Sequence, residues 1–370
     1  MFDVKSSKKR FDANKVEILN YGFPYIVRMS TNNGIKGYIN QDEQLLNQGN
    51  TIAFGQDTAT MFYQENPYFT GDKIKILECK YDNFNKINSM FLISVMRKSF
   101  STFSWGANSF SEKVINNQEI KLPTKDGKID FEFMDACIRE LEEERIRELS
   151  AYLTVSGLDN YELSSEEKEA LDKFDSPLGE KLQNVQWGEC RIGDLFEKLT
   201  LKFKKSTFNK ATDISKTRTS EFNIPLINAK FGDNGIMYYG RKNDFETASM
   251  TIDIVNDGAT STASVYPQPQ ETGVLYNAYL IKPLFNVNNQ ILYFLSTTIQ
   301  KSIKEKFGYE NKAGWEKVKK ESIQLPTKDG KIDFEFMELL ISAVQKLVIK
   351  DVVLYADEKI QSTKKIVKES

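Results

Sequence analysis

The chain has 370 residues, of which 50 are Lys or Arg and 52 are Asp or Glu, so its formal net charge is −2. It contains no histidine and three cysteines without CxxC spacing, which excludes Ser-His-Asp and Cys-His nucleophile systems and argues against a zinc site or a disulfide framework. The longest apolar runs fall far short of the roughly 18 residues that cross a bilayer. The N-terminus shows no signal-peptide pattern, and we expect a folded cytoplasmic protein of two or three domains without membrane contact.

The first element in the chain is a mixed α/β globule, which we place at residues 1–122. Short β-rich runs such as "KIKILECK" lie between turn signals such as Asn33-Gly34, and the helix-like run "KINSMFLISVMRKSF" follows them. The leading segment is basic, with Lys8, Lys9 and Arg10 close together. Basic residues among Ser and Asn neighbours are suited to contact with phosphate groups.

A thirteen-residue stretch, "LPTKDGKIDFEFM", closes this globule at residues 122–134 and recurs unchanged at 325–337. Pro suits the exit from an edge strand, and Asp-Gly is a tight-turn pair. Asp130 and Asp333 then stand where a side chain can cap the first turn of a helix. We interpret each copy as a hinge that joins a globule to a helix.

Each hinge leads into apolar residues spaced three to four apart, which is typical of one face of a long helix. We expect the first helix at 123–175, a linker at 176–186 and the second helix at 326–370. The apolar positions expected to pack these helices against each other or against a partner are Met134, Ile138, Leu141 and Leu149 in the first and Met337, Ile341, Val344 and Val348 in the second.

A second globule, at residues 187–325, is related to the first. Asn33-Gly34-Ile35 matches Asn234-Gly235-Ile236, and "DTAT" at Asp57 matches "DGAT" at Asp257. The sequence therefore predicts an α+β fold, in which two repeated mixed α/β globules are separated by two long antiparallel helices that form a coiled-coil spacer.

The start of the second globule is basic like that of the first. Between Lys198 and Arg218 the only acidic residue is Asp213. A solvated surface is the ordinary interpretation of one such cluster, but recurrence at equivalent places favours phosphate contact. The residues expected to make it are Lys8, Lys9, Arg10, Lys202, Lys204, Lys205, Lys210 and Arg218.

Polar loops supply weaker candidates for reading DNA bases. Gln and Asn can pair with adenine edges, and Ser or Thr with several bases. The candidates are Gln56, Thr58 and Thr60 in "GQDTAT", Thr260, Ser261 and Ser264 in "GATSTAS", and Asn108 and Asn311. An ordinary surface loop is the competing interpretation for each of them.

One arrangement resembles a catalytic site. "GDKIKILECK" places Asp72, Glu78 and Lys80 as in nucleases that hold Mg²⁺ with carboxylates and position water with a lysine. The equivalent strand of the second globule, "GVLYNAYLIK", lacks both carboxylates, and there is no glycine-rich cofactor turn. We expect no catalytic residues and no metal site in this chain.

The order of globule, helix, globule, helix, with a Leu-Pro hinge before each helix and "WGECRIGDLF" at 187–196 leading into the second globule, resembles the specificity subunit of type I restriction–modification systems. The specificity subunit of BcgI-like type IIB systems is similar. Met1-Phe2 aligns with Phe196, so a matching Trp-containing lead-in to the first globule is missing from this sequence.

The resemblance implies that each globule is a target recognition domain that reads one half of a bipartite duplex DNA sequence. The helices would set the gap between the half-sites and dock two methyltransferase subunits. It also implies that S-adenosylmethionine, ATP and Mg²⁺ belong to the methyltransferase and restriction subunits, and that this chain has no cofactor. The alternatives are a protein-interaction adaptor with two repeated binding domains and, third, a Mg²⁺-dependent nuclease.

Overall fold

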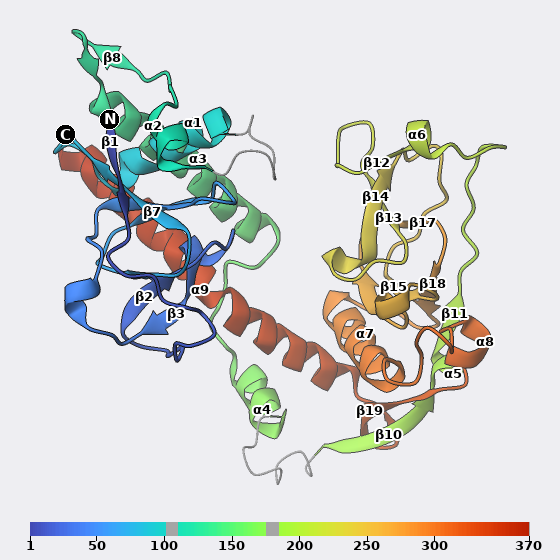
Figure 1. The fold of residues 1–370 in the computed structure, drawn as a ribbon. Helices are drawn as coiled ribbons and strands as arrows, with labels where there is room; N and C mark the ends of the chain where they lie inside the picture. The colour runs from blue at the N-terminus through green and yellow to red at the C-terminus, as the bar shows by residue number, and fades with distance from the viewer. Residues whose placement is uncertain (101–109, 175–184, 370) are drawn as a thin grey trace. The chain divides into compact units, whose positions relative to one another are not determined.

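The computed structural model describes residues 1–100, 110–174 and 185–369, with side chains described as far as residue 362 (Figure 1). The chain divides into two compact units. Unit 1 contains Met1–Tyr152 and Ala356–Ser370, and unit 2 contains Leu153–Tyr355. No helix in the described ranges is long and apolar enough to cross a membrane.

In its described residues, the globule of unit 1 contains two sheets and two α-helices. One sheet is antiparallel, and the other joins an antiparallel pair to a parallel one. The antiparallel sheet has the strand order β1 (Phe2–Ser6), β7 (Ile74–Cys79), β4 (Thr51–Gly55), β5 (Met61–Gln64). The mixed sheet has the order β3 (Ile35–Ile39), β2 (Phe23–Ile26), β6 (Phe69–Thr70). The helices are α1 (Lys86–Phe100) and α2 (Glu112–Asn116).

The globule of unit 2 repeats this plan. Its sheets follow the orders β11 (Phe196–Lys198), β18 (Ala278–Pro283), β15 (Thr251–Val255), β16 (Val265–Gln268) and β12 (Ile214–Ser215), β14 (Ile236–Gly240), β13 (Ile224–Ile227), β17 (Gly273–Val274). The helices are α5 (Ile192–Leu195), α6 (Lys210–Asp213), α7 (Asn289–Ile303) and α8 (Trp315–Val318). A third sheet contains β10 (Gln186–Arg191), β19 (Ser322–Lys328) and β20 (Lys331–Ile332).

Local contacts repeat along with the topology. Asn33 and Asn234 both adopt a positive φ, of 50° and 53°, as Asn does more readily than most residues. Their side-chain amides donate to the carbonyls of Tyr63 and Pro267 at 3.0 and 2.8 Å. These equivalent turns confirm that the two globules share one scaffold.

The core of each globule lies between its antiparallel sheet and its longer helix. Ile52 and Leu92 are completely buried in unit 1, as are Ile252 and Leu292 in unit 2. β4 and β15 are buried along their whole length, because further residues cover the second face of each sheet. This explains why β4 is almost continuously apolar instead of alternating, whereas in β15 the same burial encloses the carboxyl group of Asp253.

The hinge has the predicted structure in both copies. Asp126-Gly127 and Asp329-Gly330 all have positive φ, as a type I′ turn requires, and the turns join β8 (Thr124–Lys125) to β9 (Lys128–Ile129) and β19 to β20. The Asp130 carboxylate accepts from the backbone N–H of Phe133 at 2.9 Å, and that of Asp333 from Phe336 at 3.0 Å. Each Asp is therefore the N-cap of its helix, α3 (Phe131–Val155) and α9 (Phe334–Glu369).

The structure divides the first predicted helix, 123–175, into two. α3 stops at Val155, where Gly157 (φ 65°) donates to the Thr154 carbonyl and Leu158 donates to that of Leu153. These two bonds form a Schellman motif, which ends a helix. A separate helix, α4 (Ser165–Phe174), follows, and the predicted linker falls mostly on residues outside the described ranges.

α4 packs on α9 within unit 2. The Glu167 carboxylate, only 5% exposed, accepts from the Lys346 ammonium at 2.9 Å and from the Ser342 hydroxyl at 2.6 Å. In unit 1 the end of α9 runs opposite to α3 and beside it (Figure 1), with Lys359 bonded to Glu142 at 3.0 Å. The predicted antiparallel helix pair is thus present.

Candidate nucleic-acid interface

The basic leading segment of unit 1 lies at the surface directly after β1. Lys8, Lys9 and Arg10 are all exposed. The Lys8 ammonium donates to the Gln44 carbonyl at 3.3 Å, and the Arg10 guanidinium lies 3.3 Å from Asp72. Both contacts are exposed, so they cost little to exchange for a phosphate group.

A cavity of about 660 Å³ opens beside this segment. Its lining includes Arg10, Arg28 and Thr58. Arg28 and Lys73 both bind the carboxylate of Asp57, the latter at 2.8 Å, so two cations share one carboxylate near the cavity. The sequence analysis missed Arg28 and Lys73, because the β2, β4 and β6 ends that bring them together are far apart in the chain.

The loop "GQDTAT" contains one structural residue and two threonines, of which Thr58 is exposed and Thr60 is half-buried. The Gln56 amide donates to the Phe110 carbonyl at 3.1 Å, which fixes the loop. Thr58 and Thr60 bond each other at 2.9 Å, in a contact open to solvent. Of the three predicted base readers here, Thr58 is therefore the most open to solvent.

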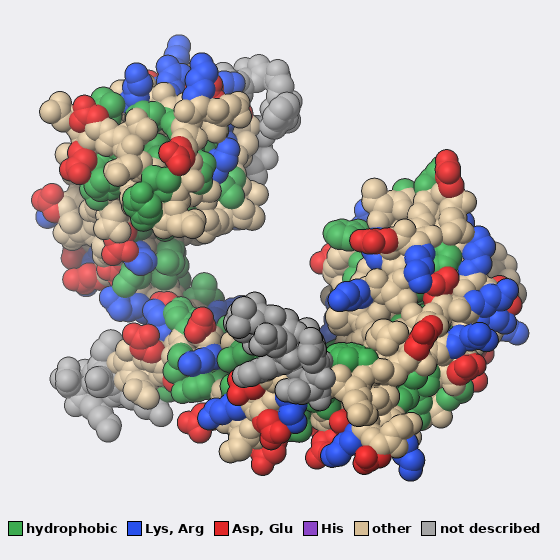
Figure 2. Space-filling model, turned by 90° about the horizontal axis from the view of Figure 1, so that it is seen from below, with side chains coloured by type: hydrophobic (Ala, Val, Ile, Leu, Met, Phe, Trp, Pro, Cys, Tyr) green, Lys and Arg blue, Asp and Glu red, His purple; other side chains and the backbone are tan. Residues whose placement is uncertain are grey.

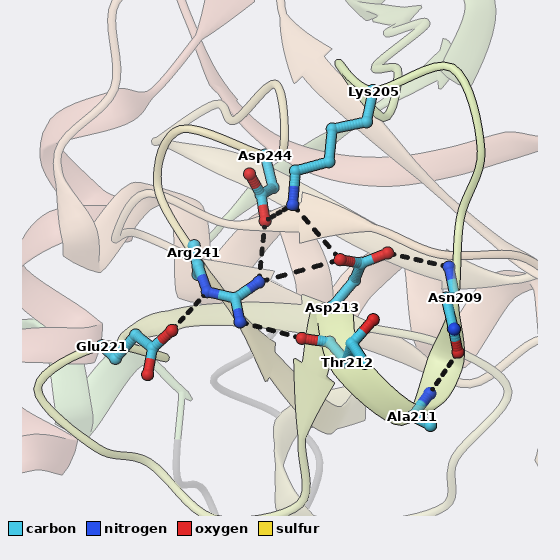
Figure 3. Close-up of polar contacts among 8 residues, drawn as sticks. All are labelled: Lys205, Asn209, Ala211, Thr212, Asp213, Glu221, Arg241 and Asp244. Atoms are coloured by element: carbon cyan, nitrogen blue, oxygen red, sulfur yellow. Dashed lines mark hydrogen bonds and ion pairs between the residues drawn. The ribbon is translucent and has the colours of Figure 1, made fainter.

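In unit 2, part of the basic leading segment forms an ion-pair network (Figure 3). The Lys205 ammonium lies 3.2 Å from Asp213 and 2.6 Å from Asp244, both of which are buried. Arg241 lies 3.1 Å from Asp244 and 2.6 Å from Glu221, and it donates to the Thr212 carbonyl at 2.8 Å. Lys205, predicted to contact phosphate, is therefore bound to carboxylates of its own globule.

Opposite charges in this network stabilise one another. The hydrogen bond to Asp244 is the main cause of a raised pKa of Lys205. The pKa of Asp213 is lowered, first by the backbone N–H of Asn209 and then by Lys205. Burial opposes ionisation of Asp244, but the hydrogen bonds from Lys205 and Arg241 outweigh it and lower the pKa of Asp244. The network is thus fully charged at neutral pH.

The other predicted cations of this segment remain at the surface. Lys202, Lys204 and Arg218 are exposed, and no ion pair joins their side chains to another described residue. The Lys210 ammonium lies 5.2 Å from the ring centre of Tyr238. Figure 2 shows Lys and Arg side chains gathered along one edge of this globule.

The second polar loop differs from the prediction. Thr260 is exposed, but Ser261 and Ser264 are each only 3% exposed. The Ser261 hydroxyl donates to the Gly258 carbonyl at 2.8 Å, and that of Ser264 accepts from Lys304 at 3.2 Å. Both serine hydroxyls are therefore engaged within the globule, and of the three candidates in this loop only Thr260 is exposed.

Of the two predicted asparagines, the structure describes only Asn311. The Asn311 amide donates to the Lys306 carbonyl at 2.8 Å, and its oxygen accepts from Lys317 at 2.8 Å, so both polar ends are used. Asn108 lies outside the described residues.

The nuclease-like residues do not form a site. Asp72 faces Arg10, Glu78 pairs with Lys5, and Lys80 binds Asp3 at 2.9 Å. No group of three or more His, Cys, Asp or Glu side chains within the described ranges could hold a metal ion. Each member of the pattern has a different partner, which argues against a shared metal.

The helix positions expected to pack fall into three classes of burial. Met134 and Met337 are completely buried in the cores of their own globules, so they cannot meet a partner. Ile138, Leu149 and Ile341 are partly buried. Leu141 of α3 is 47% exposed. Val344 and Val348 are 39% and 74% exposed, and they belong to an apolar surface of α9 formed by Val344, Leu347, Val348, Val352, Leu354 and Tyr355.

Two globules of one topology, each with basic surface loops and each mounted on a helix by an identical hinge, define a duplicated recognition protein. The chain belongs to the family described as type I restriction modification DNA specificity domain, whose sequence pattern matches residues 1–151 and 184–353. Its function is therefore DNA sequence recognition in a restriction–modification system, as a specificity subunit and not a catalytic one. The adaptor alternative is not favoured.

Known relatives agree with this assignment. The chain is 24% identical over 353 residues to the type II restriction enzyme specificity subunit S.BcgI of Heyndrickxia coagulans, covering 94% of this chain and 93% of that one. The crystal structure of a type I restriction–modification S subunit from M. genitalium has the same fold, with a TM-score of 0.54 at 14% identity over 99% of this chain and 91% of that one.

Proposed function

We propose that each globule reads one half of a bipartite duplex DNA target. The observation that carries this proposal is the combination of identical hinges with globules whose loops differ. A shared scaffold holds both globules in the same way on their helices, while the differing loops give each globule its own sequence preference. Two related readers on one chain match a target made of two separated half-sites.

Phosphate contacts come from the exposed cations of the two leading segments. In unit 1 these are Lys8, Lys9 and Arg10, with Arg28 at the adjoining cavity. In unit 2 they are Lys202, Lys204, Lys210 and Arg218. Such contacts position a protein on duplex DNA and make its affinity strongly dependent on salt.

Base contacts come from exposed hydroxyls near these cations. Thr58 lines the cavity that contains Arg10 and Arg28, and Thr60 bonds it directly. Thr260 is the exposed counterpart of Thr60 in the second globule. A Thr hydroxyl can form hydrogen bonds with several bases and does not by itself distinguish one base from another. Neighbouring backbone groups and cations must therefore contribute to the sequence preference of the globule.

The helices set the gap between half-sites and dock two methyltransferase subunits. The apolar surface of α9 supplies one docking face, and a groove of about 560 Å³ lined by Trp187, Phe294 and Val344 adjoins it. S-adenosylmethionine, ATP and Mg²⁺ belong to the methyltransferase and restriction subunits of the assembly. The matching family is named for type I systems, whereas the relative S.BcgI belongs to a type II restriction enzyme. The chain is therefore compatible with an assembly of either type.

Binding to duplex DNA at graded salt concentration tests this function. The chain with its methyltransferase subunits should select a bipartite sequence from a random duplex library, with an affinity that falls steeply as salt rises. Exchanging residues 1–122 for another member's globule should change one half-site only. Binding that ignores salt, or a change in both half-sites, would contradict the proposal.

A further inference from the structure

An aspartate lies at the same place in both globules, shortly after an inner strand of the antiparallel sheet. Asp57 follows β4, and Asp257 follows β15. The residue before each aspartate donates its backbone N–H to the carbonyl of Lys73 in unit 1 and of Asn277 in unit 2, at 3.0 and 2.9 Å. Lys73 and Asn277 both have positive φ, of 58° and 60°. The two aspartates are therefore equivalent in structure as well as in sequence.

Two cations share the aspartate of unit 1. Arg28, which follows β2, and Lys73, which precedes β7, both bind the Asp57 carboxylate. All three side chains are partly open to solvent. Since the group has one more positive than negative charge, it attracts an electronegative partner without first losing an ion pair.

The equivalent positions of unit 2 carry no cation. The backbone hydrogen bonds at the ends of β2 and β13 match, so Arg28 corresponds to Ala229. The counterpart of the other cation, Asn277, is also uncharged. Asp257 instead binds Lys312, which lies between α7 and α8. The carboxylate is thus common to both globules while its cations come from different elements, as expected for a position that sets the sequence preference of each globule.

Arg28 lies beside the loop that contains Thr58 and has hydrogen-bond donors to spare. Its Nη1 donates to Asp57, whereas Nε and Nη2 make no hydrogen bond with another described residue. A Cβ on Gly55 would come within 2.7 Å of the Thr58 hydroxyl oxygen and 3.4 Å of the Arg28 Cγ, so glycine allows the loop and the arginine to lie together. Arg28 and Thr58 both line the cavity of about 660 Å³.

A phosphate contact alone does not account for this arrangement. A carboxylate beside a cation weakens the attraction of that cation for phosphate, because the two anionic groups repel each other. Contact with the edge of a base, in contrast, requires a guanidinium group that is held in one orientation. The bond from Nη1 to Asp57 supplies that orientation and leaves Nε and Nη2 of Arg28 as a fork of two donors.

We propose that Arg28, beyond the charge that it brings to the cavity, reads a guanine in the half-site of the first globule, with Asp57 as the residue that orients it. Guanine presents two neighbouring acceptors, O6 and N7, in the major groove, and an arginine fork matches both. Lys73 supplies charge only, because an ammonium group has no such fork. This inference rests on the proposed function, in which the first globule reads one half-site.

Selection from a random duplex library by the chain with its methyltransferase subunits is the first test. We expect the half-site of the first globule to contain a G·C pair, and Arg28→Ala should reduce the preference for it about tenfold or more without changing the other positions. Arg28→Lys keeps the charge without the fork and should recover only part of the preference. Lys73→Met is the matched control, which should weaken binding to every duplex equally and keep the preference.

Asp57→Ala separates orientation from charge. Loss of the carboxylate makes the cavity more basic, so the affinity for unrelated duplex DNA should rise at low salt. The preference for the G·C pair should fall, because the Arg28 guanidinium is no longer held in one orientation. A merely structural role of Asp57 would lower the affinity for all duplexes and would contradict its assignment as the orienting residue.

Replacement of a single atom in the DNA identifies the contact. A duplex with 7-deazaguanine in place of the selected guanine lacks the N7 acceptor. It should bind the unaltered chain about tenfold more weakly than the ordinary duplex does, since a hydrogen bond from a charged donor is lost. Arg28→Ala should bind both duplexes equally. Fluorescence anisotropy with the complete complex measures all four affinities.

Three results would overturn the inference: a first half-site without a G·C pair, an unchanged preference in Arg28→Ala, or equal weakening of the unaltered chain and Arg28→Ala by 7-deazaguanine. Each would show that Arg28 reads no guanine. The proposed function would survive any of them as long as the unaltered complex selects a bipartite sequence. Failure of that selection is the separate result that would contradict the proposed function itself.

Discussion

Asp253 is a buried carboxyl group without a partner in the centre of β15. Its side chain is completely buried, and neither of its oxygens accepts a hydrogen bond from a described residue. Burial raises the pKa of Asp253 well above its ordinary value of 3.8. The equivalent residue of β4 is Ala53, so the scaffold itself does not need a carboxyl group at this position.

We expect Asp253→Ala to stabilise unit 2 by about 1–3 kcal/mol at neutral pH, the usual cost of burying an unpaired polar group. Because the pKa of Asp253 is raised in the folded state, its burial lowers the free energy of unfolding least below pH 3.8, where the carboxyl is protonated in both states. The loss is greatest above the folded pKa, where the buried group must ionise. The gain should therefore grow as pH rises. Thermal unfolding at several pH values measures it, with the exposed Asp233→Ala as control. A loss of stability in Asp253→Ala would reveal a partner for the carboxyl group.

Lys204 and Lys205 are adjacent but have different surroundings. Lys205 joins two buried carboxylates, whereas Lys204 is exposed. Lys205→Met should lower the unfolding temperature of unit 2, because it leaves Asp213 and Asp244 with one cation fewer. Since the pKa values of both carboxyls are lowered, this contribution is present at neutral pH and lost below about pH 4 as they protonate.

Lys204→Met is the matched control for DNA binding. It should leave the unfolding temperature unchanged. It should also weaken DNA binding and reduce the slope of log affinity against log salt concentration by about 1, the change expected for the loss of one phosphate contact. Calorimetry and fluorescence anisotropy separate the two effects. If Lys205→Met weakened DNA binding without loss of stability, the network would be a DNA site.

At the scale of elements, the sequence predicts structure where local interactions decide it. The Asp-Gly turns and the two N-caps depend on residues within one turn of the chain, and both were predicted. The end of α3 was also encoded locally, by Gly157, but the charged run after it suggested a continuing helix. The Arg28–Asp57–Lys73 and Lys205–Asp244 contacts could not be predicted, because they join residues far apart in the chain and depend on which strands pair and in what register.

The two N-caps offer a test with a built-in repeat. Asp130→Ala and Asp333→Ala should each destabilise the attached unit by about 1 kcal/mol, because each leaves a helical N–H without its acceptor. Asp→Asn at the same positions should retain most of the stability. Chemical denaturation of each variant measures the loss, and a large difference between the two copies would show that the identical hinges are not equivalent in energy.

The length of the helices is expected to determine how many base pairs separate the two half-sites. Deleting four residues from α3 after Met134 removes about 6 Å of helix, or nearly two base-pair steps at about 3.4 Å each. The selected gap between half-sites should shorten while both half-sites stay the same. Selection from a library with random spacing measures this, and altered half-sites with an unchanged gap would refute the division of roles between globules and helices.

At the scale of the whole molecule, assembly depends on apolar side chains that the chain leaves uncovered. Val348 is 74% exposed and Leu347 51% exposed on α9, while Met337 of the same helix is completely buried in its own globule. The difference separates the inner face of the helix, which holds unit 2 together, from an outer face available to a methyltransferase subunit.

Val348→Glu should preserve folding, because substitutions at exposed positions usually change stability by less than about 0.5 kcal/mol. It should weaken assembly with the methyltransferase subunit at least about tenfold, because the new carboxylate would be buried without a partner at the interface. Val348→Ile keeps the surface apolar and should assemble normally. Light scattering of the mixed subunits gives affinity and stoichiometry, and normal assembly of Val348→Glu would place the methyltransferase contact elsewhere on the chain.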